Sequence, residues 1–285
     1  MDPIALKTFV AVARCGSVSG AAEELHTVQS NVTARVKQLE SELGVQLFVR
    51  HSRGVFPTPA GERLLAFAQR FNALDDELRA ELRDDDAIRG HLRIGTMETT
   101  GAVRLPSVLK RFHGSHPDTQ LDVRTGTTAD LLEQVLLHKL DGAFVAGPVA
   151  HPGLVGSAVF AEELVLVRAA GSLDVDERLR EGRLTVIMFR LGCAYRQRME
   201  AAFAEQGWLP YQRLEFGTVE GILGCVEADV GVAVLPRSVV DSLAVRKQLA
   251  VESLGHHGLM VDTWFVQRAD ADRGAVMKAF EAVLC

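Results

Sequence analysis

The sequence predicts two structural parts: an N-terminal, mostly helical domain of the winged helix-turn-helix class and a C-terminal α/β domain. Between Ser17 and Gly61 a short helical pattern, a tight turn and a longer helical pattern are followed by a basic hairpin. A long helical stretch with a repeating apolar stripe comes next. From Gly90 onward, short apolar strands alternate with helical patterns, which is typical of an α/β domain.

The composition fits a globular protein with more than one domain. The 285 residues are enough for two domains or three small lobes, and the 47% hydrophobic share is ordinary. No apolar run is long enough to span a bilayer, and the apolar stretch before Arg14 is too short for a signal peptide. We therefore expect a cytoplasmic protein that does not associate with membranes.

Motifs for metal, disulfide or catalytic chemistry are missing from the sequence. No G-x-S-x-G, H-E-x-x-H, phosphate loop or dinucleotide-binding glycine pattern follows a strand, so we expect no cofactor, no catalytic residues and no enzyme activity. The cysteines form no C-x-x-C pair, which argues against a metal site and a disulfide framework. The four are Cys15, Cys193, Cys225 and Cys285.

Three helices are expected in the first 43 residues. Apolar residues at helical spacing predict the first over 3–14, and Ser17 or Ser19 is suited to cap the second. Ala21 and Ala22 are small enough to let two helices cross closely. The third helix is predicted over 29–43, with an inner stripe of Val32, Val36, Leu39 and Leu43.

The outer side of the third helix is polar and suits DNA. Although the net charge is -6, the segment from residue 26 to 58 holds four Lys or Arg and two Glu, so the basic character is local. Gln and Asn side chains pair with adenine, Arg with guanine, and Ser and Thr with phosphate. A solvated helix face is the alternative for each residue taken singly. The predicted DNA contacts on this helix are Gln29, Ser30, Asn31, Thr33, Arg35 and Lys37.

A hairpin wing is predicted over residues 45–56. Leu47 and Phe48 are expected to point inward, and the basic side chains Arg50, His51 and Arg53 toward the DNA backbone. An ion pair between Arg50 and a carboxylate of the third helix is a rival reading. After the wing, Thr58 is expected to cap a new helix that has Pro59 at its first position.

The helix that starts at Pro59 carries an apolar stripe close to a heptad repeat. Packing on the chain's own body is one explanation. The other is an antiparallel pair with a second subunit, which makes the stripe a dimerisation surface. The stripe consists of Leu64, Phe67, Phe71, Leu74 and Leu78, and continues to Leu82.

The second half is predicted to hold open, largely parallel sheets. Ligands in such sheets bind beyond the carboxyl ends of strands, where helix N-termini point into a crevice. The expected helices are 103–113, 129–140, 195–206 and 219–228. The expected strands are 91–95, 120–125, 142–146, 164–168, 184–189, 213–217, 231–235 and 263–267.

The chain resembles the LysR-type bacterial transcription regulators over nearly its whole length. Ser30 departs from the family, which usually has Pro at this position. The matching residues are Ser17, Ala21, Ala22, Leu25, Gln29, Val32, Leu39, Glu40, Leu43, Gly44, Leu47, Phe48, Arg50, Arg53 and residues 58–61.

The resemblance implies a C-terminal effector-binding domain with the two-lobed, periplasmic-binding-protein-like fold. It implies a DNA-binding domain over 1–58 that contacts DNA through Ser17 as well as the third helix, and a linker and hinge over 59–89. The effector-binding domain then covers 90–285. Its first lobe is expected over about 90–161 and 267–285, and its second over about 162–266.

The family binds its small-molecule effector at positions matching Thr99, Thr100 and the strand-end loops. Threonine hydroxyls and free helix N–H groups suit a carboxylate, so we expect a small organic anion. Plain helix capping is the alternative for Thr127 and Thr128. The expected effector-binding residues are Thr99, Thr100, Thr127, Thr128, Arg190, Cys193 and Thr218.

Cys193 supports a second hypothesis, a redox-responsive regulator. Its expected place at a helix N-terminus, near Arg190 and Arg196, would lower the thiol pKa and favour the thiolate. A polar residue lining the cleft is the preferred reading of Cys193. A solute-binding protein is a remote alternative, opposed by the winged helix and by the missing signal peptide.

The expected partners follow from the family resemblance. They are double-stranded promoter DNA, a small-molecule effector and further copies of the same chain, as a dimer or a tetramer. RNA polymerase joins them if the protein is an activator. The sequence does not identify the effector, the operator or the direction of regulation.

Overall fold

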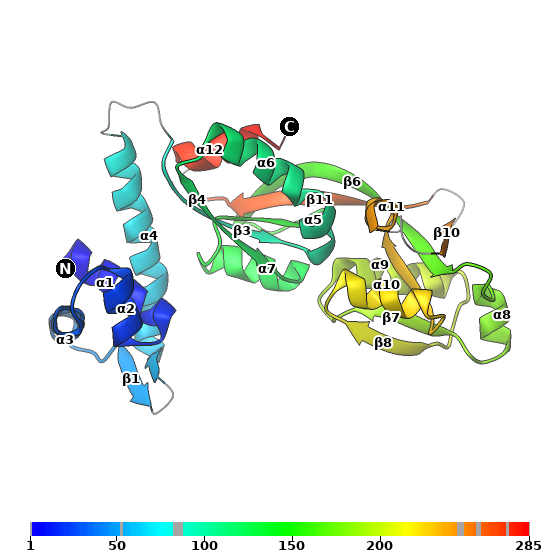
Figure 1. Cartoon of the computed structure of the whole chain (residues 1–285), viewed down its shortest axis with the longest axis horizontal. Coiled ribbons are helices and arrows are strands. Elements are labelled where there is room, and N and C mark those ends of the chain that lie inside the picture. Colours follow the sequence, from blue (N-terminus) through cyan, green and yellow to red (C-terminus); the bar gives the residue numbers. More distant parts are fainter. Residues whose placement is uncertain are drawn as a thin grey trace. The chain divides into compact units, whose positions relative to one another are not determined.

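The computed structural model describes residues 2–51, 54–81, 88–243, 248–254, 258–271 and 274–284. The chain forms two compact units, residues 1–91 and 92–285, shown from blue to cyan and from green to red in Figure 1. Each unit is described separately.

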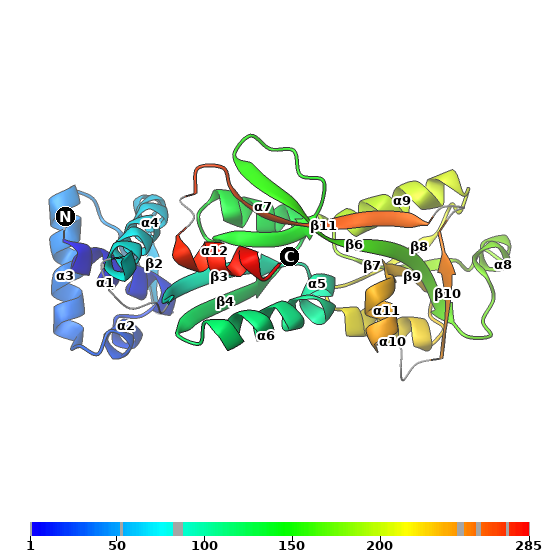
Figure 2. The same cartoon turned by 90° about the horizontal axis from the view of Figure 1, so that it is seen from above.

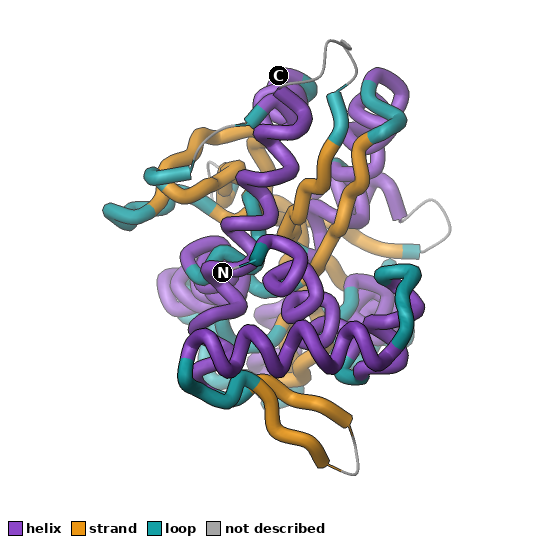
Figure 3. The backbone as a smooth tube through the Cα atoms, turned by 90° about the vertical axis from the view of Figure 1, so that its left-hand side faces the viewer, coloured by secondary structure: helices purple, strands orange, loops and turns teal. Residues whose placement is uncertain are grey.

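The first unit is a winged helix-turn-helix domain. Its third helix has the predicted bounds, and the wing is an antiparallel hairpin in which Val49 pairs with Phe56. Figure 3 shows this hairpin projecting below the long horizontal helix α3. The elements are α1 (Pro3–Cys15), α2 (Val18–Glu24), α3 (Gln29–Leu43), β1 (Phe48–His51), β2 (Gly54–Pro57) and α4 (Pro59–Glu81).

Side-chain caps begin three of these four helices. The Ser17 hydroxyl accepts a hydrogen bond from the Gly20 N–H at 3.0 Å, and the Thr58 hydroxyl accepts one from Gly61 at 3.0 Å. Both caps agree with the predictions from the sequence. The Asp2 carboxylate caps α1, whereas Val28 at the start of α3 has no capping side chain.

Two apolar clusters hold the domain together. Phe9, Leu39 and Leu47 are fully buried in one of them, and Val32 in the other. The predicted inner stripe of α3 is confirmed at Val32 and Leu39. It is wrong at Leu43, which is 40% exposed because it is the last helical residue before the left-handed turn at Gly44.

The second unit is built on one mixed sheet, whose order among the described residues is β4-β3-β5-β11-β6-β9-β7-β8, with β10 beside β6. Its helices are α5 (Glu98–Val103), α6 (Leu105–Ser115), α7 (Thr128–Leu136), α8 (Val175–Arg180), α9 (Ala194–Glu205), α10 (Val219–Glu227), α11 (Arg237–Leu243) and α12 (Ala275–Ala282). Its strands are β3 (Gly90–Thr96), β4 (Thr119–Thr125), β5 (Gly142–Ala146), β6 (Leu154–Ala169), β7 (Thr185–Phe189), β8 (Gln212–Phe216), β9 (Val232–Pro236), β10 (Leu249–Ser253) and β11 (Leu259–Arg268).

The two long strands β6 and β11 join two lobes. Lobe I contains β3–β5, α5–α7 and α12, and lobe II contains β7–β10 and α8–α11 (Figure 2). One half of β11 pairs with β5 of lobe I, and one half of β6 pairs with β9 of lobe II. The register between β6 and β11 shifts at Thr263/Trp264, in the middle of this connection.

The expectation of largely parallel strands needs correction in the middle of the sheet. β5 runs parallel to β3, and β7 runs parallel to both β8 and β9. By contrast, β10, β11 and β6 pair antiparallel. The sequence predicted only residues 164–168 of β6, because the earlier part of that strand is mostly exposed and Gly156, Ser157, Glu162 and Glu163 interrupt its apolar residues.

Candidate DNA-contacting surface and effector site

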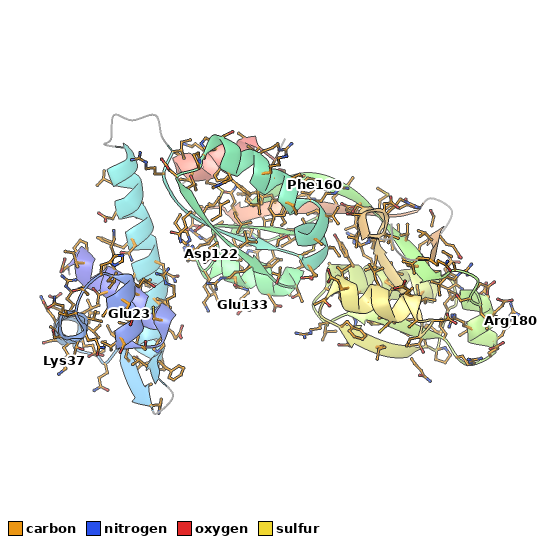
Figure 4. The ribbon with its side chains drawn as sticks, in the orientation of Figure 1. Glu23, Lys37, Asp122, Glu133, Phe160 and Arg180 are labelled. Carbon is orange, nitrogen blue, oxygen red and sulfur yellow. The ribbon has the colours of Figure 1, made fainter. Side chains whose placement is uncertain are left out.

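The outer side of α3 presents the polar residues that the sequence predicted there. Gln29, Ser30, Asn31 and Lys37 are exposed. Figure 4 labels Lys37 on this helix, away from the packed interior of the domain. Because Val32 and Leu39 pack into the domain core on the inner side of α3, the outer side of the helix remains accessible to a DNA groove. Thr33 and Arg35 are half-buried on the flank of this surface.

Asn31 is held in place by its neighbour. Its Nδ2 donates to the Thr27 hydroxyl at 3.2 Å, one turn earlier in the chain. This contact restricts the amide before DNA arrives, which reduces the entropy lost on binding. The Ser17 hydroxyl oxygen caps α2 by accepting from the Gly20 N–H, which leaves its O–H able to donate to a phosphate oxygen.

The wing is attached to α3 through Glu40. Its Oε1 accepts hydrogen bonds from the Leu47 N–H at 2.8 Å and the Phe48 N–H at 3.3 Å. Arg50 lies on β1 opposite Val55, and its side chain lies outside the described part of the structure. Arg53 lies outside the described residues.

A hollow of about 510 Å³ separates α3 from the wing. Lys37 and Thr33 line it from the helix, and Val49 and His51 line it from the wing. The rest of its lining is mostly apolar, from residues such as Val36, Phe48 and Val55, and includes the acidic Glu40, so Lys37 and His51 are its basic residues.

The apolar stripe of α4 divides into two parts. Leu64 and Ala68 pack on the core of the first unit. By contrast, four large apolar side chains on the same helix face solvent in the single chain, and Leu82 lies outside the described residues. The exposed side chains are Phe67, Phe71, Leu74 and Leu78.

Three hydroxyls meet at the boundary between the lobes of the second unit. Thr99 comes from α5 of lobe I, Tyr195 from the first turn of α9 in lobe II, and Thr263 from β11 between them. All three side chains are more than 95% buried, and the Tyr195 hydroxyl faces those of Thr99 and Thr263. Burial raises the pKa of Tyr195 above its ordinary value, so the phenol stays protonated at neutral pH.

Two of these hydroxyls have no well-formed hydrogen bond. Neither the Thr99 Oγ1 nor the Tyr195 hydroxyl has a partner of good geometry among the described residues, and both atoms are buried. A buried polar group without a partner is costly, and such groups mark places where a ligand or water completes the structure. Sequence reasoning missed Thr263, because it follows the pattern of an ordinary strand residue.

Other threonines predicted for the effector site have internal partners. Thr127 and Asp130 form a capping box at the start of α7, and the Thr128 hydroxyl accepts from the Ala146 N–H at 3.3 Å. The Thr218 hydroxyl caps α10 by accepting from the Gly221 N–H at 3.2 Å. Thr100 is buried beside Thr99. Capping, the alternative expected for Thr127, therefore accounts for its hydroxyl and also for that of Thr218.

The loop before α9 lies against lobe I. A Cβ added to Gly192 would come within 3.1 Å of the Thr127 Oγ1, so this loop contacts the N-terminus of α7. The Arg190 guanidinium lies over Gly217 in lobe II. Arg190 therefore borders the strand-end loops without reaching the three hydroxyls in any described contact.

The expectation that the pKa of the Cys193 thiol is lowered is wrong. Burial raises the pKa of Cys193 above its usual value, and this outweighs the backbone N–H groups of Arg196 and Tyr195 and the charge of Arg196, which lower it. The Arg196 guanidinium is also occupied by Glu200 at 3.1 Å and by Glu215 at 2.7 Å. The thiol is therefore mostly protonated at neutral pH, and a protonated thiol is a poor nucleophile.

An acidic pair lies at the rim of the same boundary. Burial and the nearby Glu220 charge raise the pKa of Glu98, although the Val219 N–H at the start of α10 lowers it. Glu98 begins α5 in lobe I and Glu220 belongs to α10 in lobe II, so the two negative charges repel each other across the lobe boundary. The sequence did not single out either residue.

The described residues contain no group of three or more His, Cys, Asp or Glu side chains suited to hold a metal ion. Within the same part of the chain, none of the helices is both long and apolar enough to cross a membrane.

Comparison with known proteins divides the chain into an N-terminal and a C-terminal part, as the two structural units do. Residues 4–62 match the family model described as bacterial regulatory helix-turn-helix protein, lysR family. Residues 85–284 match the model described as LysR substrate binding domain.

Curated relatives align over almost the whole chain. The HTH-type transcriptional regulator GltR of Bacillus subtilis is 38% identical over 275 residues, which cover 96% of this chain and 93% of the relative. The HTH-type transcriptional regulator YofA of Bacillus velezensis is 40% identical over 279 residues, which cover 98% and 95%.

Solved structures share the fold. A full-length OxyR variant from Pseudomonas aeruginosa superimposes with a TM-score of 0.77 at 23% identity, and the match covers 100% of this chain and 94% of that one. At this identity the likeness establishes the fold alone.

Proposed function

This chain belongs to the LysR family of bacterial transcription regulators, and we propose that a small organic carboxylate, held between its two lobes, controls its binding to promoter DNA. Regulators of this family bind DNA and small-molecule effectors and form oligomers. The observation that carries the proposal is that the buried hydroxyls of Thr99 and Tyr195, which belong to different lobes, face each other without a hydrogen bond of good geometry.

A carboxylate suits these hydroxyls because each of its oxygens accepts hydrogen bonds from O–H donors. Thr99 and Tyr195 both supply such donors, and the protonated state of the Tyr195 phenol keeps its donor available. A ligand bound to both residues would contact lobe I and lobe II at once. It would therefore change the free energy of one arrangement of the lobes relative to another, which is the requirement for an effector.

The DNA-contacting surface in this proposal is the outer side of α3 together with the wing. Gln29, Asn31 and Arg35 are assigned to base edges, and Ser30, Thr33 and Lys37 to base edges or phosphates. Arg50 and Arg53 of the wing are assigned to the DNA backbone. The exposed positions of Gln29, Ser30, Asn31 and Lys37 support the assignment.

Assembly is assigned to α4. Four large apolar side chains along one helix are exposed in the single chain, and a second copy is the occupant that the heptad-like spacing favours. Two copies also double the modest number of basic groups facing DNA. A tetramer built from such dimers, and contact with RNA polymerase if the protein activates transcription, extend the proposal.

Redox control through Cys193 is the weaker candidate. A protonated thiol reacts slowly with oxidants, and burial raises the pKa of Cys193. We also assign no enzyme activity, in keeping with relatives that are named transcriptional regulators.

The proposal is tested by measuring binding of the full-length protein to DNA from its own promoter region. A panel of small carboxylates and aromatic acids is added at fixed salt, because affinity for DNA depends strongly on salt. The expected result is specific binding whose strength one carboxylate changes. Specific binding that no carboxylate alters would reject the effector class and leave the DNA-binding assignment standing.

Tyrosine variants locate the effector. Tyr195→Phe removes the unpartnered hydroxyl and is expected to weaken the response to the active carboxylate by about tenfold, while DNA binding without effector is unchanged. The control is Tyr211→Phe, since these are the two tyrosines of the chain and Tyr211 packs on Phe203 within lobe II. An equal response of both variants would move the effector elsewhere.

A further inference from the structure

Two adjacent glutamates lie where β6 passes from one lobe to the other. Glu162 and Glu163 face opposite sides of the strand, because side chains alternate along β-structure. Each carboxylate binds one arginine and one serine. The two sites have the same chemistry but differ in which lobes they connect.

The carboxylate of Glu162 bridges the lobes. Its Oε1 accepts from the Arg104 Nε at 2.7 Å, and its Oε2 accepts from the Ser238 hydroxyl at 2.6 Å. Arg104 follows α5 in lobe I, and Ser238 belongs to α11 in lobe II. The Glu162 side chain is only 6% exposed, so solvent weakens these charge-assisted hydrogen bonds very little.

Arg104 is fixed on the lobe I side. Its guanidinium lies over the Phe160 ring, 5.6 Å from the centroid, and Phe160 in turn stacks on the buried Phe144. Figure 4 labels Phe160 beside the helices of lobe I. A displacement of Arg104 would therefore disturb both a cation–π contact and the bond to Glu162.

The carboxylate of Glu163 binds within lobe II instead. It accepts from the Arg237 Nε at 2.6 Å and from the Ser253 hydroxyl at 2.7 Å. Arg237 begins α11 and Ser253 ends β10, and both elements belong to lobe II. Loss of this carboxylate would weaken lobe II without removing a link to lobe I.

We propose that Glu162 is a positioning residue that couples α5 of lobe I to α11 of lobe II and so carries the effector signal between the lobes. The effector part of this inference rests on the proposed function. α5 holds Thr99 and Thr100, and the Arg104 N–H bonds to the Thr100 carbonyl at 2.9 Å. One short helical turn therefore separates the hydroxyl site from the bridge.

The test uses tryptophan fluorescence, because the chain has two tryptophans in different places. Trp264 lies on β11 at the register shift, against Gly147, whose carbonyl accepts a bond from Arg198 of lobe II at 2.7 Å. Trp208 lies within lobe II, where its indole N–H donates to Asp176 at 2.9 Å. Acrylamide quenching of Trp264 in a Trp208→Phe background reports whether the lobe boundary opens.

Glu162→Gln is expected to raise the quenching constant of Trp264 by about twofold in the effector-free, full-length protein. Glu163→Gln, the matched control, is expected to leave it unchanged. The quenching constant of Trp208, measured in a Trp264→Phe background, is expected to change little in either glutamate variant. Equal Trp264 quenching in both glutamate variants would overturn the proposal. An equal rise in the Trp208 quenching constant of Glu162→Gln would also overturn it, because that rise would indicate a general loosening of the domain.

Two further variants keep the test decisive if Glu162→Gln does not fold. Ser238→Ala removes the lobe II arm of the bridge, and Arg104→Lys removes the Nε donor of the lobe I arm. Each is expected to raise Trp264 quenching less than Glu162→Gln, and unchanged quenching in both would overturn the bridge. None of these measurements uses an effector, so their failure is distinct from failure of the carboxylate proposal.

Discussion

The backbone of Gly147 lies directly against the indole of Trp264. A Cβ at position 147 would come within 2.1 Å of the Trp264 ring, closer than any side chain tolerates. The Gly147 N–H donates to the Asp262 carbonyl at 2.8 Å, and its carbonyl accepts from Arg198 at 2.7 Å. Since these bonds fix the backbone from both sides, only glycine fits beside the ring.

Gly147→Ala is therefore expected to destabilise the second unit. Overpacking of this kind costs about 1–3 kcal/mol in free energy of unfolding, measured by denaturant titration. Gly114→Ala in α6 is the control, because a Cβ there meets nothing within 4 Å and alanine favours a helix. Combining Gly147→Ala with Trp264→Ala is expected to cost less than the sum of the two, and strict additivity would show that the ring is not the obstacle.

Gln29→Ala is expected to reduce affinity for the specific operator by about tenfold or more while the fold and the oligomer remain intact. The exposed amide at the start of α3 is placed for a base edge. Gln38→Ala is the control, since it removes the same amide more than two turns further along α3, and the Gln38 amide is already bonded to Glu42. Both affinities are read from fluorescence anisotropy at one salt concentration. Equal losses in the two variants would show that the Gln29 amide makes no specific base contact.

Leu74→Asp is expected to dissociate the oligomer. The Leu74 side chain is 55% exposed on α4 in the single chain, and a charge buried in an apolar helix pair costs several kcal/mol. Light scattering after gel filtration measures the mass. Glu62→Lys, which changes charge on the first turn of the same helix, is expected to leave the mass unchanged. If the Leu74→Asp variant kept the full oligomer mass, the apolar stripe of α4 would not be the contact between subunits.

The Glu98 carboxyl predicts a pH dependence of stability. Its pKa is raised in the folded protein, mainly by burial and then by the Glu220 charge, so the ionised form is disfavoured on folding. Stability therefore increases as the pH falls from above the folded pKa toward the ordinary value of 4.5.

Glu98→Gln is accordingly expected to be more stable than the natural protein at pH 7, by less than about 1 kcal/mol because solvent screens the exposed part of the group. The advantage is expected to shrink as the pH falls and to vanish near the ordinary pKa of 4.5. Thermal unfolding at pH values of about 7, 5.5 and 4 spans this range and measures the difference. A difference that grows toward low pH would contradict the assigned direction.

The N-terminal domain followed closely from the sequence because its signals are local. Helical spacing, a capping serine and the Thr58-Pro59 start each act within a few residues, and α3 has the predicted bounds. Exposure of Leu43 was missed because a helix end depends on how the following turn leaves the core.

The middle of the C-terminal sheet did not follow, because antiparallel pairing joins residues far apart in the chain. β10 and the first half of β6 have mixed exposure, and their apolar residues are short runs broken by Gly, Ser or Glu. The first half of β6 pairs with β11, and β10 pairs with the second half of β6, through pairs such as Val251 with Val167.

The candidate sites show the same difference between local and distant signals. Polar residues on one side of α3 are a property of helical spacing, so they were predicted. The capping role of Thr127 remained one of two readings, since a threonine before a helix suits both capping and ligand binding. The thiol of Cys193 could not be judged without its burial, which reverses the effect expected from nearby arginines.

The sequence by itself determined the winged helix-turn-helix, the apolar stripe of α4 and the family, because these reside in spacing along one helix or one motif. Only the tertiary structure decided which hydroxyls lack partners and which carboxylate joins the lobes. Thr99, Tyr195 and Thr263 are separated by many residues in the chain and meet only where α5, α9 and β11 converge. Glu162 and Glu163 are chemically identical neighbours, and because side chains alternate along β6, the first bridges the two lobes and the second bonds within lobe II.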